Sequence, residues 1–67
     1  MTNQSRITAA QTALDAHRDR TRDFTSDNEE AITDLMTNLR HLCEAEDLDF
    51  TGIVRMSRTN FVEEQIG

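Results

Sequence analysis

Apolar residues in the middle of the chain recur at the spacing of one helix face. When successive residues are turned by about 100°, they fall within an arc of about 140°, and polar residues fill the rest of the circle. The apolar set is Ala31, Ile32, Leu35, Met36, Leu39, Leu42 and Cys43. The pattern predicts an amphipathic helix at about 28–45.

The residues before this helix carry a start signal. Ser26, followed three positions later by Glu29, fits a capping box, in which the two side chains satisfy free backbone N–H groups. Acidic side chains then crowd the first turn, where the helix dipole favours negative charge. We therefore expect Ser26 to cap this helix.

A further helix is predicted at about 49–65, after a short connection. Asp49 is a suitable N-cap, and a stripe of residues recurs after it at helical spacing. We expect this stripe to be buried, and its members are Phe50, Ile53, Val54, Ser57 and Phe61. Met56, Val62 and Ile66 fall off the stripe and are expected to form an exposed apolar patch.

The first segment, at about 4–20, has a thinner helical pattern. Its stripe consists of Ile7, Ala10, Leu14 and His17, and its frequent alanines favour a helix. A polar turn follows, and we expect Phe24 in this turn to pack on the core. No stretch alternates apolar and polar residues as a strand does. The sequence predicts an all-α fold, a single small three-helix domain over 1–67 with short loops.

The size of the chain restricts its chemistry. A chain of 67 residues buries only about 60 % of its unfolded surface, which leaves little room for an enzyme cleft of about 300–1,000 Å³. We expect no enzyme activity and no cofactor. His41 and Cys43 point to different helix faces, and His41 with Glu44 makes too few ligands for a closed zinc site. We expect no metal, with Cys43 in the core and His41 in solvent.

Charge and composition narrow the possible partners. Thirteen Asp and Glu against seven Arg, with no Lys, give a net charge of −6. Arg55 and Arg58 follow a short turn, as in a helix-turn-helix, but the net charge opposes direct binding to nucleic acid. The sequence has no apolar run of about 20 residues, no N-terminal apolar run that resembles a signal peptide, and a single cysteine. We expect a cytoplasmic protein that does not bind membranes, either monomeric or homodimeric.

Eight of the thirteen acidic residues fall into two groups in the sequence. The first is Asp27, Glu29, Glu30 and Asp34, and the second is Glu44, Glu46, Asp47 and Asp49. Placement at helix N-termini accounts for several of them. It does not account for Glu44, which lies near a helix C-terminus, nor for Glu46 and Asp47. We predict that both groups bind a partner. The alternative interpretation is a solvated acidic surface of ordinary net charge.

The stretch from Glu30 to Glu64 resembles a group of short bacterial and phage-borne proteins. The residues that carry this resemblance are Ile32-Thr33-Asp34-Leu35, Leu39-Arg40-His41-Leu42-Cys43, Asp49-Phe50 and Phe61. The size, acidity and helical plan are also similar to those of anti-CRISPR inhibitors that imitate DNA, among them one acting on type I-C interference complexes. The resemblance implies an inhibitor that occupies the DNA-binding surface of such a complex, in particular that of its large subunit.

Two hypotheses follow. The first is an acidic inhibitor that competes with DNA for a basic protein groove inside a bacterial host cell. The alternative is a helical protein–protein interaction module, such as a dimeric accessory or antitoxin-like protein, that docks through apolar surface. Added salt separates them, because exposed charges are screened beyond about 8 Å at about 0.15 M. Docking through carboxylates should weaken with salt, whereas apolar docking should hardly change.

Overall fold

Three helices with short connections make up the computed structural model, which describes the backbone of residues 2–66 and the side chains of residues 2–65. The helices are α1 (Asn3–Thr21), α2 (Asn28–Ala45) and α3 (Phe50–Ile66). The predicted all-α class is confirmed, and each helix begins and ends within one residue of its expected position.

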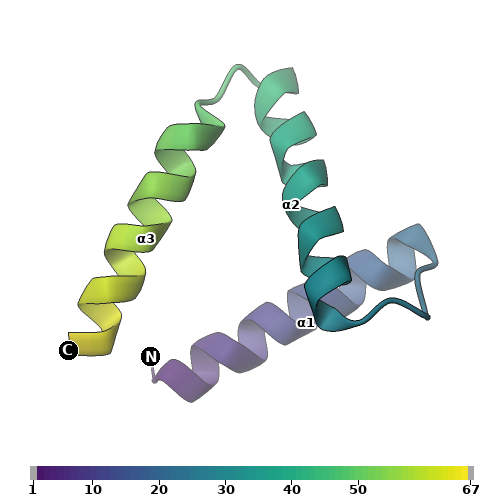
Figure 1. Ribbon diagram of the computed structural model, residues 1–67, viewed down its shortest axis with the longest axis horizontal. Coiled ribbons are helices and arrows are strands. Elements are labelled where there is room, and N and C mark those ends of the chain that lie inside the picture. Colours follow the sequence, from purple (N-terminus) through teal and green to yellow (C-terminus); the bar gives the residue numbers. More distant parts are fainter. Residues whose placement is uncertain (1, 67) are drawn as a thin grey trace.

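The helices enclose an open triangle rather than a closed bundle. In Figure 1, α2 and α3 form two sides, and α1 crosses the base. Arg6 Nε lies 3.1 Å from the Glu64 carboxylate and joins the start of α1 to the end of α3. The Cα radius of gyration is 13.3 Å, whereas a compact chain of this length has one of about 10.9 Å. The chain is therefore expanded for its size.

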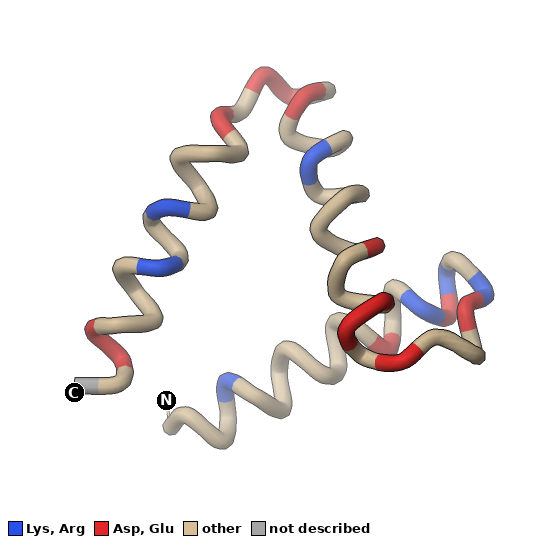
Figure 2. The backbone as a smooth tube through the Cα atoms, viewed as in Figure 1, with Lys and Arg blue, Asp and Glu red and all other residues tan. Residues whose placement is uncertain are grey.

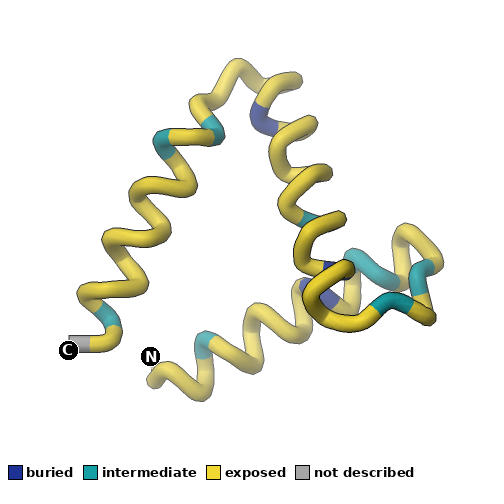
Figure 3. The backbone as a smooth tube through the Cα atoms, in the orientation of Figure 1, coloured by how far each residue is buried: buried dark blue, intermediate teal, exposed yellow. Residues whose placement is uncertain are grey.

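The crossing of α1 and α2 holds most of the buried core (Figure 3). Leu14 is 4 % exposed and Ala31 is 1 % exposed. Two hydrogen bonds flank the crossing, from Asn28 Nδ2 to Gln11 Oε1 and from Asn38 Nδ2 to His17 Nε2. Leu14 lies one helical turn from both bonded residues of α1, so its side chain lies between the two bonds. The small side chain of Ala31 allows the helices to approach closely.

The connection between α1 and α2 is held by Arg18. Its Nε donates to the Asp23 carbonyl at 3.2 Å, and its Nη2 donates to the Ser26 carbonyl at 2.7 Å. The Asp23 carboxylate accepts from the Ser26 hydroxyl and from the backbone N–H groups of Ser26 and Thr25. These bonds, chiefly that from the Ser26 hydroxyl, lower the pKa of Asp23. The connection is thereby folded back along α1.

The N-cap of α2 is Asp27, so the expectation of a cap at Ser26 is wrong. The Glu30 N–H donates to Asp27 Oδ1 at 2.9 Å. The hydroxyl of Ser26 is engaged by Asp23 instead. Both residue types make good caps, and the competing bond to Asp23 decides between them.

Both α1 and α2 end in a Schellman motif. The N–H of Asp23 donates to the Arg18 carbonyl at 2.9 Å, and the N–H of Leu48 donates to the Cys43 carbonyl at 2.8 Å. The residues just before these donors, Arg22 and Asp47, have a φ of 57°. Glycine is the usual residue at this left-handed position because a Cβ is disfavoured there.

Several residues expected in the core are exposed instead. Phe24 is 69 % exposed, Ile53 47 %, Val54 38 % and Phe61 62 %. Ser57, expected on the same buried stripe, is exposed as well. The expectations for α3 are wrong because α3 diverges from α2, so most of its apolar stripe meets no neighbouring helix (Figure 1). The expectation for Phe24 is wrong because the connection between α1 and α2 leaves its side chain in solvent. Phe50 is half-buried, with the guanidinium of Arg40 4.9 Å from its ring centroid. Two expectations for α2 are confirmed, because Cys43 is buried and His41 is exposed to solvent.

Candidate functional site

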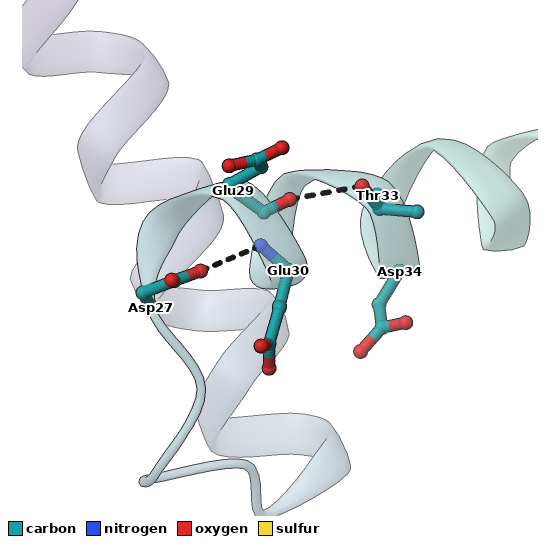
Figure 4. A pocket seen from close by; sticks show the side chains of 5 residues that line it. All are labelled: Asp27, Glu29, Glu30, Thr33 and Asp34. Carbon is teal, nitrogen blue, oxygen red and sulfur yellow. Dashed lines mark hydrogen bonds between the residues drawn. The ribbon is translucent and has the colours of Figure 1, made fainter.

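The first acidic group lines an open depression at the start of α2. The depression has a volume of about 430 Å³, and its lining residues are Asp27, Glu29, Glu30, Thr33 and Asp34. Figure 4 shows Glu30 and Asp34 projecting to one side of the helix and Glu29 to the other. Asp27 is engaged in capping the helix. Glu30 and Asp34, four residues apart, are thus the pair that the fold brings to one face.

The second acidic group surrounds the corner between α2 and α3. Glu44, Glu46, Asp47 and Asp49 are all exposed there, and Figure 2 shows their segment as the acidic tip of the triangle. Asp49 lies over the first turn of α3, because a Cβ added at Gly52 would meet its Oδ2 at 2.6 Å. Gly52 therefore leaves room for this carboxylate.

The two acidic groups lie at opposite ends of α2. At a rise of about 1.5 Å per residue, Asp27 and Glu44 are about 25 Å apart along the helix. Duplex DNA carries about 15 phosphates over that length, at one charge per about 1.7 Å. All eight carboxylates are exposed, and within residues 2–65 none of them is in an ion pair. The groups therefore supply about half the charge density of a duplex.

Exposed apolar side chains run along α2 from the first acidic group to the corner and continue along α3 beyond it. These side chains are each at least 38 % exposed. We call this the α2–α3 apolar surface, and its members are Ile32, Met36, Leu39, Leu42, Ile53, Val54, Met56, Phe61 and Val62. Of these nine residues, the sequence predicts exposure for Met56 and Val62. Ile66 is predicted in the same exposed patch, but its side chain lies outside the described residues. The others were assigned to the core or to the apolar face of α2.

Charge is distributed unevenly around the apolar surface. Residues 35–43 and 50–62 contain no Asp or Glu, and the charged residues within them are Arg40, Arg55 and Arg58. Figure 2 shows the resulting pattern along α2, with red segments at both ends, a smaller red segment part-way along its first half, and only tan and blue in the rest. The apolar surface thus carries positive charge and is bordered by carboxylates.

Two open depressions interrupt the apolar surface. One, of about 440 Å³, is lined partly by Ile32, Met36 and Phe50, with Arg40 at its edge. The other, of about 260 Å³, lies between the start of α1 and the end of α3, where Ile7 and Phe61 line it beside the Arg6–Glu64 ion pair. Both depressions are open rather than enclosed.

The described residues provide little for chemistry of other kinds. Among residues 2–65, no group of three or more His, Cys, Asp and Glu side chains is placed to hold a metal ion. None of the helices in the described part of the chain is both long enough and apolar enough to cross a membrane. Comparison with known proteins finds no matching family, no matching curated protein and no matching solved structure.

Proposed function

We propose that this chain is a helical protein–protein interaction module that docks through the α2–α3 apolar surface. The observation that supports this most strongly is the exposure of large apolar side chains. Twelve are at least 38 % exposed, while the buried apolar residues of the described chain are Leu14, Ala31 and Cys43. Single exposed apolar residues are ordinary. A surface formed by nine of them on two adjoining helices is typical of a binding site.

The proposal is tested by how binding responds to salt and to two kinds of substitution. The immobilised chain is incubated with lysate of its own host, and the dissociation constant of the retained protein is measured with NaCl at about 0.1 M and about 0.5 M. Binding through the apolar surface should change less than about threefold over this range. Leu39→Glu should weaken it at least about 30-fold. Phe24→Glu, the same change in charge outside the surface, should leave it unchanged.

A second candidate function is the acidic inhibitor that competes with DNA for a basic protein groove, with the large subunit of a type I CRISPR interference complex as the suspected target. The exposure of all eight carboxylates of the two acidic groups, none of them in an ion pair within residues 2–65, favours this candidate, and the conformation of Asp47 fits it. A left-handed backbone normally selects glycine, and an acidic residue is found there instead, in the group where Glu44 also opposes the helix dipole. Carboxylates that reduce stability are expected where binding requires them.

The same experiment separates the two candidates. If carboxylates dominate, the dissociation constant rises at least about tenfold between the two salt concentrations. The double charge reversal Glu46→Arg and Asp47→Arg then abolishes binding, while Leu39→Glu has little effect. That combination would contradict the proposed docking through apolar surface.

A further inference from the structure

We infer that α3 is a hinged arm, which pivots at the link between Leu48 and Asp49 and is latched to α1 by the Arg6–Glu64 ion pair. The α2–α3 apolar surface continues across this link, from α2 onto α3. Rotation of the arm therefore changes the angle between the two halves of that surface. Such rotation is a property of the free chain, whatever the surface binds.

The hydrogen bonds around the corner between α2 and α3 locate the pivot. On the α2 side, the N–H of Leu48 donates to the Cys43 carbonyl at 2.8 Å. On the α3 side, the N–H of Ile53 donates to the Asp49 carbonyl at 3.0 Å. Among the described residues, no hydrogen bond crosses the link between Leu48 and Asp49. The backbone dihedrals of this link are therefore where α3 can rotate against α2.

Two side-chain contacts hold the arm in place. Arg40 lies 4.9 Å from the ring centroid of Phe50, the first residue of the arm, so this contact is close to the pivot. At the far end, Arg6 Nε lies 3.1 Å from Glu64, and Arg6 Nη1 donates to Asn3 Oδ1 on α1. At about 1.5 Å per residue, Glu64 is about 22 Å from the pivot, so a rotation of about 10° moves it by about 4 Å. The ion pair is therefore the contact most sensitive to the angle of the arm.

The positions of the two ion-pair partners are unfavourable for their own helices. Arg6 lies near the N-terminus of α1 and Glu64 near the C-terminus of α3, where the helix dipoles disfavour these charges. Helix stability therefore does not account for this placement, whereas a contact between the two helices does.

Added salt should release the latch. The side chains of Arg6 and Glu64 are 39 % and 32 % exposed, and an exposed ion pair shifts an equilibrium by no more than about fivefold. A depression of about 260 Å³ separates Ile7 from Phe61 beside the pair, so close apolar packing does not replace it. At about 1 M salt, charges are screened beyond about 3 Å. The arm should then sample a wider range of angles.

Electron–electron double resonance between two spin labels on the full chain tests the inference. Cys43→Ala removes the native thiol, and labels at Arg20→Cys and Asn60→Cys report the distance from α1 to the arm. We expect a distance distribution at least about twice as broad at about 1 M NaCl as at about 0.05 M. Arg6→Gln should give the broad distribution at both salt concentrations, and Glu64→Gln should do the same.

Two controls separate a latch from a general loosening of the fold. Labels at Arg20→Cys and Glu44→Cys report the distance from α1 to α2, and their distribution should stay narrow under every condition. The exchanged pair, Arg6→Glu with Glu64→Arg, should restore the narrow distribution of the arm at low salt. The inference is overturned if salt and Arg6→Gln leave the distribution of the arm unchanged, if both label pairs broaden together, or if the exchanged pair stays broad.

Discussion

Among the side chains of residues 2–65, Leu14 is the one large aliphatic group that is buried almost completely, so its truncation should separate α1 from α2. Leu14 is 4 % exposed and lies between the hydrogen bonds Gln11–Asn28 and His17–Asn38. Replacing a buried leucine with alanine costs about 2–5 kcal/mol. On α2, Ala31 and the half-buried Leu35 lie between the bonded residues Asn28 and Asn38 on the same helix face. We therefore expect a value at the lower end, about 2–3 kcal/mol.

This loss is large against the total stability of so small a chain. At about 0.05–0.15 kcal/mol per residue, 67 residues give a free energy of unfolding of about 3–10 kcal/mol. Each kcal/mol shifts the melting temperature of a domain of this size by about 4–8 °C. Leu14→Ala should lower it by about 10–20 °C, measured by circular dichroism at 222 nm and at fixed protein concentration.

Ile7→Ala is the matched control, because Ile7 lies on the same helix and is 61 % exposed. It should change the free energy of unfolding by less than about 0.5 kcal/mol. The reasoning is refuted if the two variants melt together, or if Leu14→Ala melts like the parent. Either result would mean that α1 does not pack on α2 through Leu14.

Three further predictions concern helix ends and acid stability. Asp27→Ala should lower the free energy of unfolding in urea by about 1 kcal/mol because the N-cap of α2 is lost, whereas Glu29→Ala should be nearly neutral. Equal losses in the two variants would instead support a capping box formed by Ser26 and Glu29. Asp47→Gly should raise stability by about 0.5–1 kcal/mol by relieving the left-handed backbone, and a destabilised variant would contradict that conformation. The folded pKa of Asp23 lies below its ordinary value of 3.8, so its contribution is present above that value and is lost as pH falls through the lowered pKa. Asp23→Asn should flatten this acid limb of the unfolding midpoint against pH, and an unchanged limb would assign it to other carboxylates.

The helices themselves are predictable from the sequence because their signals are local. Apolar spacing and the acids after Asp27 place α2 correctly, and the burial of Cys43 follows from its position on the apolar arc. The N-cap was misassigned by one residue. Ser26 and Asp27 are both suitable, and only the fold shows that Asp23 engages the Ser26 hydroxyl.

The angles between helices are not encoded in such patterns. The stripe containing Ile53 and Phe61 has the spacing of a buried face, yet both residues are exposed because α3 diverges from α2. That divergence is set by the corner at residues 46–49, where Asp47 adopts a left-handed conformation. A periodicity shows which side chains need a partner, but it does not show whether the partner lies in the same chain.

The candidate site was predictable only in part, because its acidic residues follow from local sequence and its apolar surface depends on the angles between helices. The exposure of the eight acids follows from their type and number, whereas the projection of Glu30 and Asp34 from one side of α2 requires the helix geometry. The apolar surface was missed because its residues were assigned to a core that the fold does not close. The signal in the sequence was that Met56 and Val62 fall off the apolar stripe of their helix, and both are exposed.

Hydroxyl-radical footprinting of the bound chain, with the modified residues read by mass spectrometry, tests the location of the docking surface most directly. Met36 and Met56, which are 41 % and 60 % exposed in the free chain, should become protected in the complex, and Phe24 should remain as reactive as before. The account is contradicted if both methionines stay reactive while protection is confined to Leu48 in the acidic corner between α2 and α3.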